Sequence, residues 1–147
     1  MQFLLDLFVE QNEVLGYRQS TDGTAIPILS NHEPIITEPV VILVNQGTQG
    51  PAELFALVLQ ERHQATIIGE TTFGSAVDYR IQYPKKDWVL MLADTEILSA
   101  KKHSWHEQGI TPNMSIPRGI VEVSTYTGVH HVDRQLQTAV QLISTSP

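Results

Sequence analysis

The chain has 147 residues, 41% of them hydrophobic, which is enough to bury the core of one domain spanning residues 1–147. Its formal net charge is -7, from 9 basic and 16 acidic residues, and no run of Lys or Arg exceeds two, so the composition argues against nucleic acids and anionic membranes as partners. The absence of cysteine excludes disulfides, thiolate catalysis and cysteine metal sites.

The first nine residues (MQFLLDLFV) are apolar and are interrupted by Asp6. They are too short for a membrane span and lack the basic leader of a signal peptide. We interpret residues 1–9 as the end of an amphipathic core helix. Its apolar surface predicts a homodimer, or a heteromeric partner, that covers Phe3, Leu4, Leu7 and Phe8.

Strands and helices are predicted to alternate along the rest of the chain. The short β-branched run at residues 40–45 (VVILVN) is typical of an inner strand of a parallel sheet. The helix after it begins at Pro51, which is preset for the first turn, and has Glu53 near the positive end of its dipole. Its core-facing stripe consists of Leu54, Phe55, Leu57 and Val58.

The full pattern indicates an α/β layer fold with a mixed sheet. The predicted strands are 13–19, 24–29, 40–45, 65–70, 77–83, 88–98 and 114–124, and the predicted helices are 1–9, 51–62 and 133–144. The turn between the first two strands is Ser20-Thr21-Asp22-Gly23.

Four blocks of sequence, in the right order, resemble the C-terminal processing, or tail-specific, serine proteases. They are residues 40–74 (VVILVN, a small-residue loop, Ala52-Glu53 and then IIGETTFG), residues 88–93 (WVLMLA, similar to the family's strand after its catalytic loop), residues 109–113 (GITPN, where the family has Gly-Ile-x-Pro-Asp) and residues 133–139 (DRQLQTA). The resemblance covers most of the chain. It implies the ClpP/crotonase-like fold of that catalytic domain, a serine endopeptidase ancestry and a family whose members are commonly exported; the compartment of this chain stays undetermined.

The same resemblance, carried over residue by residue, predicts a loss of catalysis. The family's nucleophilic serine stands three residues before the glutamate matched by Glu53, and that position is Gly50. The general base is a lysine after Phe-Gly, and that position is Ser75. The glutamine that orients this lysine falls on Tyr79, or on Asp78 if the loop slips by one residue. Glycine has no side chain, and an ordinary hydroxyl cannot act as a neutral lysine does.

The front of the family's catalytic domain is expected to lie outside this chain. Its loop of the form Asp-Leu-Arg-x-Asn-x-Gly-Gly, whose backbone helps to bind the oxyanion, precedes the helix that we match to residues 1–9. The family's PDZ domain is not found in the sequence either. The chain therefore resembles the C-terminal half of a larger catalytic domain.

We accordingly expect a non-catalytic relative of these peptidases that acts as a peptide-binding or assembly module without a cofactor. Its site is the former substrate groove, where an exposed sheet edge accepts an extended chain. The alternative is a serine-type peptidase that is completed by a second chain or works through other residues, with Thr48 as the substitute hydroxyl and Ser75 and His63 as further candidates.

Histidine spacing raises the question of a metal site. His103 and His106 are three residues apart and His130 and His131 are adjacent, so a site would need the fold to join them with Glu107 or Asp133. Because spacing alone is weak evidence, we expect structural or exposed histidines and no bound metal. We interpret Trp88 and Trp105 as packing residues.

Overall fold

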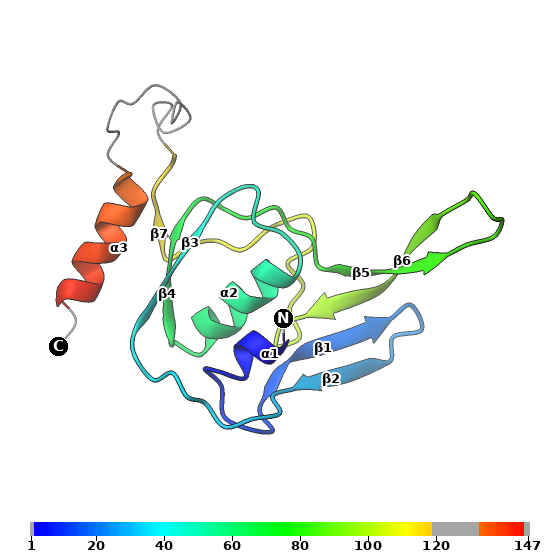
Figure 1. Ribbon diagram of the computed structural model, residues 1–147, viewed down its shortest axis with the longest axis horizontal. Coiled ribbons are helices and arrows are strands. Elements are labelled where there is room, and N and C mark those ends of the chain that lie inside the picture. The colour runs from blue at the N-terminus through cyan, green and yellow to red at the C-terminus, as the bar shows by residue number, and fades with distance from the viewer. Residues whose placement is uncertain (1, 119–132, 146–147) are drawn as a thin grey trace.

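The computed structural model describes residues 2–118 and 133–145. Within these residues the chain forms three helices and seven strands (Figure 1). Their bounds are α1 (Gln2–Leu5), β1 (Val14–Ser20), β2 (Ala25–Leu29), β3 (Val40–Val44), α2 (Pro51–Glu61), β4 (Ala65–Gly69), β5 (Val77–Gln82), β6 (Leu90–Leu98), β7 (Met114–Ser115) and α3 (Arg134–Thr145). At 4, 11 and 12 residues, the described helices are too short to cross a bilayer.

The strands form two sheets. Four are antiparallel in the order β2-β1-β6-β5, and three are parallel in the order β3-β4-β7. The predicted α/β class is confirmed, with the parallel and antiparallel pairs divided between two sheets. Among the described strands β3 is an edge strand rather than the inner strand predicted. Its apolar run is explained by α3, which packs on β3 and β4.

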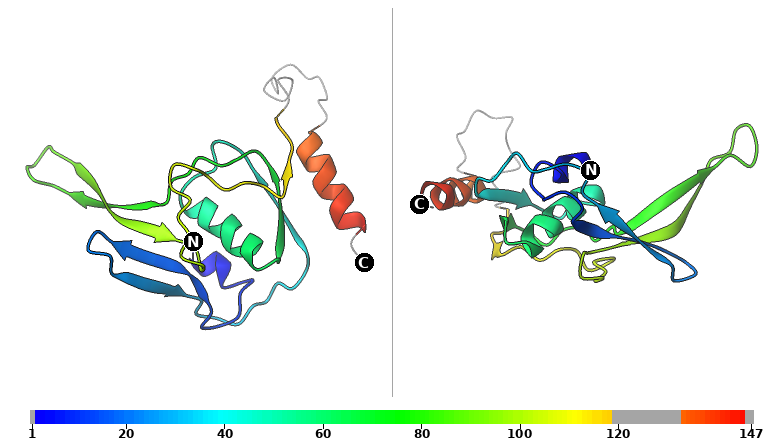
Figure 2. Two further views of the ribbon diagram at one scale, coloured as in Figure 1. Left: turned by 180° about the vertical axis from the view of Figure 1, so that it is seen from behind. Right: turned by 90° about the horizontal axis from the view of Figure 1, so that it is seen from below.

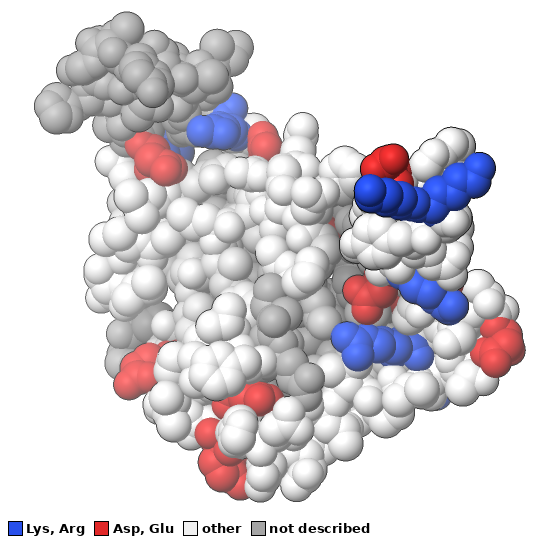
Figure 3. All heavy atoms as spheres, turned by 45° about the vertical axis from the view of Figure 1, so that its right-hand side comes forward, with Lys and Arg blue, Asp and Glu red and all other residues white. Residues whose placement is uncertain are grey.

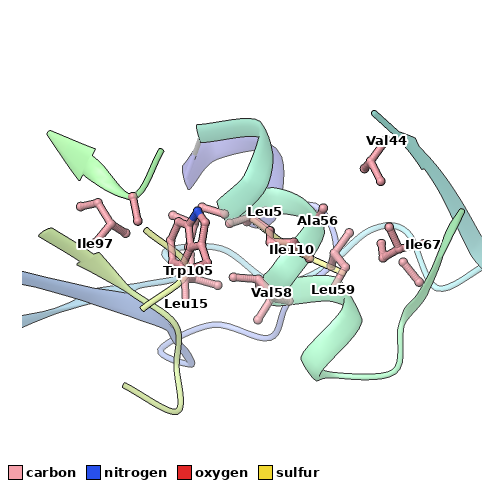
Figure 4. Close-up of a cluster of buried hydrophobic side chains, with 14 residues drawn as sticks. Leu5, Leu15, Val44, Ala56, Val58, Leu59, Ile67, Ile97, Trp105 and Ile110 are labelled. Carbon is pink, nitrogen blue, oxygen red and sulfur yellow. The ribbon is translucent and has the colours of Figure 1, made fainter. Parts of the chain in front are cut away.

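Helices α2 and α3 lie on opposite sides of the three-stranded sheet (Figures 1 and 2). The predicted stripe of α2 is confirmed, since Leu54 and Val58 are buried and Phe55 and Leu57 pack against the core. Both sheets contribute to this core. Figure 4 shows Trp105 beside Leu15 and Ile97 at one end of the cluster and Val44 with Ile67 at the other.

The hairpin of β5 and β6 projects away from the rest of the molecule (Figures 1 and 2). Strand β6 begins at Leu90 rather than at Trp88 because the Trp88 N–H donates to the Lys85 carbonyl and closes the turn. The prediction that Trp88 is a packing residue is wrong, since 64% of its surface is exposed and its ring lies under the Lys85 ammonium group. Trp105, in contrast, is buried in the core.

The turn predicted at residues 20–23 joins β1 to β2 as expected. The Gly23 N–H donates to the Ser20 carbonyl, and the Thr24 N–H donates to Oδ1 of Asp22 over 2.8 Å. This hydrogen bond from the Thr24 backbone holds the pKa of Asp22 below its usual value.

Helix α1 is shorter than the predicted helix 1–9. The chain leaves helical geometry after Leu5, where the buried Asp6 carboxylate accepts a hydrogen bond from the Asn31 N–H (2.9 Å). The Leu7 carbonyl then accepts from the backbone N–H groups of Ile35 and Ile36. Turns continue as far as Val9, whose N–H donates to the Leu5 carbonyl, but the Leu7 carbonyl is bonded to a distant loop and does not serve a further helical turn.

The predicted strand 114–124 is present only as Met114–Ser115, and residues 119–124 lie outside the described residues. The short strand is parallel to β4, with Ile68 opposite Met114. The other predicted elements are confirmed to within one residue at each end.

Candidate functional site

The site predicted from the sequence lies where β3 turns into α2. Asn45 shapes this turn: its Oδ1 accepts a hydrogen bond from the Gly47 N–H (2.8 Å), and its own N–H donates to the Thr48 hydroxyl oxygen (3.1 Å). The Thr48 carbonyl accepts from the Phe73 N–H (2.9 Å), which ties this turn to the loop after β4. Thr48 therefore acts as a turn residue in this geometry.

Gly50 is the N-cap of α2 and has φ 58° and ψ -123°. Such a conformation is readily adopted by glycine and is strained for other residues. A Cβ at this position would meet no atom closer than the Ser75 carbonyl oxygen at 4.0 Å. A side chain at the position where the resemblance puts a nucleophile would therefore have room, but the backbone conformation there is strained for residues other than glycine.

Glu53 joins the two loops that carry the degenerate positions. Its side chain is completely buried, and one carboxylate oxygen accepts from the N–H groups of Gly50 (2.9 Å) and Ser75 (2.8 Å). The other oxygen accepts from the Gly74 N–H (2.7 Å) and the Thr72 hydroxyl. Four donors on one buried carboxylate hold Gly50 and Ser75 in a fixed relation.

This network continues into the loop at residues 109–113. The Thr72 hydroxyl oxygen accepts from the Ile110 N–H (2.7 Å). Gly74 has φ 90°, and a Cβ there would come within 2.8 Å of the Gly109 nitrogen, so only glycine allows the two loops to approach so closely.

Asn113, which stands where the family has an aspartate, is also used structurally. Its Oδ1 accepts from the Ile67 N–H (2.8 Å) and from Nε2 of Gln60 (3.2 Å). The amide thus retains an acceptor oxygen at the point where this loop meets α2 and β4.

Gly50 and Ser75 line the same cavity, which has a volume of about 330 Å³. Its walls are mainly apolar and come from the four-stranded sheet, α1, α2 and the segment that carries Trp105. They include Leu5, Leu15, Ile28, Leu54, Ile97 and Trp105. The Trp105 indole N–H has no hydrogen-bond partner among the described residues. At the mouth, Arg18 and Asp78 form an exposed ion pair with Nε and Oδ2 3.3 Å apart.

The remaining predicted positions are not gathered at this cavity. Tyr79 lies on β5 with 52% of its surface exposed and does not line it, whereas Asp78 does. His63 lies beyond the C-terminal end of α2, whose 11 residues span about 16 Å, and Gly50 lies at the other end. The fold therefore does not bring Thr48, Ser75 and His63 together as a triad.

The histidines considered for a metal site are His103, His106, His130 and His131. Within residues 2–118 and 133–145, no three His, Cys, Asp or Glu side chains are grouped so that they could hold a metal ion. His130 and His131 lie outside the described residues. The backbone N–H groups of His103 and His106 donate to the hydroxyls of Ser99 and Ser104.

Comparisons with known proteins agree with this geometry. The model of peptidase family S41 matches residues 3–116. The chain is 27% identical over 128 residues to the carboxyl-terminal-processing protease of Synechocystis sp., covering 87% of the chain and 30% of that relative. It is also 27% identical over 128 residues to the carboxy-terminal processing protease CtpA of Bacillus subtilis, covering 87% of the chain and 26% of that protein.

Solved structures show the same fold. A putative S41 protease from Bacteroides fragilis superposes with a TM-score of 0.76 at 19% identity, over 97% of this chain and 40% of that one. A photosystem II D1 C-terminal processing protease gives a TM-score of 0.66 at 19% identity, over 79% of this chain and 30% of that one. The chain thus spans less than a third of the length of the two curated relatives described above.

Proposed function

Because the chain belongs to peptidase family S41 and has Gly50 and Ser75 where its relatives are expected to have nucleophile and base, we propose that it is a non-catalytic member that binds an extended peptide or protein segment. The observation that carries this proposal is the cavity lined by both positions. Without a serine at position 50 and a lysine at position 75, the cavity lacks the nucleophile and base pair that the resemblance implies. Their absence also leaves room for a ligand.

The cavity suits an apolar side chain. Its volume of about 330 Å³ lies at the small end of ligand pockets, and its walls are mainly aliphatic and aromatic. Strand β5 begins at Val77, beside the cavity, and in the described sheet it pairs only with β6. An extended segment can therefore add to the free edge of β5 while one of its side chains enters the cavity.

We expect the purified chain to have no peptidase activity. Unstructured protein substrates and short peptides should show only background hydrolysis, and a fluorophosphonate reagent should label no residue, because Gly50 offers no nucleophile and the Thr48 hydroxyl is engaged in its turn. Hydrolysis that disappears in Thr48→Ala or Ser75→Ala would contradict the proposal. That result would favour a peptidase that works through other residues.

Peptide binding is expected to depend on the free volume beside Ser75. In a Trp88→Phe background, Trp105 is the single tryptophan and its fluorescence reports occupation of the cavity. We would titrate acetylated ten-residue peptides that carry one central Leu, Phe or Asp. The Leu and Phe peptides should give saturable changes, and the Asp peptide should not, because burial of a charge is unfavourable.

The variant Ser75→Leu should fill the cavity and weaken binding of the Leu and Phe peptides at least about tenfold. Ser144→Leu, on the exposed face of α3, is the matched control and should bind as the parent does. Equal affinities of the two variants would show that the cavity is not the binding site.

The N-terminal helix is our second proposed contact surface. Phe3 and Leu4 are exposed, whereas Leu5 and Val9 are buried and Phe8 packs edge-on against Phe55. A protein partner that covers Phe3 and Leu4 would remove an apolar patch from water. Phe3→Asp is the appropriate test variant, because Phe8 also supports the core.

A further inference from the structure

The antiparallel sheet has two edges, and they differ in how they are protected. Edge strand β2 contains Pro27 at its centre, and proline blocks strand addition because it has no N–H to donate. Edge strand β5 contains neither proline nor lysine, since Lys85 and Lys86 lie beyond it in the hairpin turn. Strand β5 is therefore the open edge of this sheet within the described residues.

The sequence of β5 is complementary to itself. Residues 77–81 read Val-Asp-Tyr-Arg-Ile, which is apolar, acidic, aromatic, basic and apolar. If two such strands pair antiparallel about Tyr79, Asp78 of each copy lies opposite Arg80 of the other. Val77 then lies opposite Ile81, and the two Tyr79 side chains meet at the centre. Opposite-charge and aromatic pairs directly across two strands are stabilising.

The neighbouring registers lack this complementarity. Pairing centred on Arg80 or on Asp78 would place like charges opposite each other, which is destabilising. A register shifted by one residue from the pairing centred on Tyr79 would place the apolar side chains of one strand opposite the polar side chains of the other. Only the register centred on Tyr79 therefore matches both charge and face.

From these features we propose that β5 pairs with β5 of a second copy of this chain around a two-fold axis at Tyr79. The apolar face supports this arrangement. Tyr79 and Ile81 have 52% and 50% of their surfaces exposed, and Met91, directly opposite Ile81 on the same face, has 57% exposed. In a two-fold dimer the Val77, Tyr79 and Ile81 side chains of the two copies meet across the paired strands, which removes part of this apolar surface from water.

The ion pairs already made by β5 do not oppose this pairing. Asp78 pairs with Arg18, and Arg80 pairs with Asp94, but the Asp78, Arg80 and Arg18 side chains are more than half exposed. Exposed pairs contribute little, so sharing these charges with a second copy costs little.

The hairpin is basic, whereas the chain as a whole is acidic. Residues 79–93 contain Arg80, Lys85, Lys86 and Asp87, a net charge of +2, within a chain whose net charge is -7. Figure 3 shows a group of blue side chains at the upper right, where the hairpin comes forward. Because each copy has a net charge of -7, long-range charge opposes association, and the proposed dimer depends on the local pairing of Asp78 with Arg80.

Pairing about Tyr79 would place the second copy beside residues that line the cavity. In this register Ile81 of the second copy lies opposite Val77, a cavity-lining residue, and Tyr83 of the second copy lies opposite Ser75. The second copy would therefore occupy the edge at which we place the peptide. This competition rests on the proposed function, whereas the dimer itself does not.

The test is sedimentation velocity of the 147-residue chain over a range of concentrations. Five paired residues per strand make a small interface, so we expect a dimer with Kd of about 1–100 µM. Arg80→Asp and Asp78→Arg should each raise Kd at least about thirtyfold, because each places like charges across the axis. Mixed together, the two variants should form a heterodimer with Kd close to the parent value, since all four facing charges are then opposite.

Lys86→Asp is the matched control, since it changes the net charge by as much as Arg80→Asp does and should keep the parent Kd. Circular dichroism and thermal unfolding would verify that each variant is folded. The proposal is overturned by a parent chain that stays monomeric at its highest soluble concentration, by single variants that dimerise like the parent, or by a mixture that stays monomeric. A dimer lost only in Phe3→Asp would place the interface at α1 and would also overturn it.

Discussion

Replacing Glu53 with glutamine is expected to lower the free energy of unfolding by about 2–4 kcal/mol. The carboxylate accepts four hydrogen bonds, three of them from backbone N–H groups. A glutamine amide has a single acceptor oxygen, and its NH₂ group would face N–H donors at either carboxylate position. At least one backbone N–H, that of Gly74 or those of Gly50 and Ser75, would then be buried without an acceptor.

Urea unfolding followed by tryptophan fluorescence would measure this effect. Glu10→Gln is the control, because that side chain is exposed, and it should change the free energy of unfolding by no more than about 0.5 kcal/mol. Glu53→Ala should be more severe than Glu53→Gln, since it removes every acceptor and leaves a cavity. If Glu53→Gln unfolded at the same urea concentration as Glu10→Gln, the carboxylate would not be what holds the two loops together.

The role of Glu53 shows where reasoning from the sequence reaches its limit. Its position in the first turn of a helix indicates only an interaction with the helix dipole, which is a local effect. Its partners Thr72, Gly74 and Ser75 are 19 to 22 residues away, and their approach depends on how the loops fold over α2. In the sequence, only the motifs that end at Glu53 and at Gly74 point to these two loops. Neither motif indicates that the Glu53 carboxylate joins the loops.

Local elements were predictable because their causes are local. The β-branched run of β3, Pro51 at the start of α2 and the apolar stripe of that helix are each fixed by neighbouring residues. The end of α1 was not predictable in the same way, because the Leu7 carbonyl just beyond it bonds to the distant N–H groups of Ile35 and Ile36. The exposure of Trp88 was also missed, since whether an aromatic strand residue is covered depends on what packs against the hairpin.

Gly50 and Ser75, the two positions singled out by the resemblance, line one cavity. The resemblance could align these positions because each follows a recognisable motif. It could not supply the walls, which come from Leu5, Leu15 and Trp105 in three distant segments. Side chains that meet only after folding leave no pattern in one sequence.

The double variant Gly50→Ser/Ser75→Lys, which restores both side chains implied by the family, is expected to remain without peptidase activity. The backbone at position 50 has φ 58°, so a serine there costs about 1–3 kcal/mol unless its surroundings enforce that geometry. Space is not the obstacle, because a Cβ would meet nothing closer than 4.0 Å.

The restored lysine faces a second difficulty. To act as a general base it must be neutral at the working pH, which requires burial away from other charges. The Asp78 carboxylate lines the same cavity and would favour the charged ammonium form. Tyr79, where the family has its orienting glutamine, is exposed on β5 and does not line the cavity, so its side chain does not replace that amide.

Oxyanion stabilisation is the third requirement for turnover. The family resemblance assigns it in part to a loop ahead of the helix matched to residues 1–9, and losing a single oxyanion donor reduces turnover roughly a hundred- to a thousandfold. We would measure peptide hydrolysis and fluorophosphonate labelling of the double variant, with Gly50→Ala/Ser75→Lys as the control that lacks the hydroxyl. Hydrolysis by the serine variant and not by the alanine variant would mean that two side chains alone separate this chain from a peptidase.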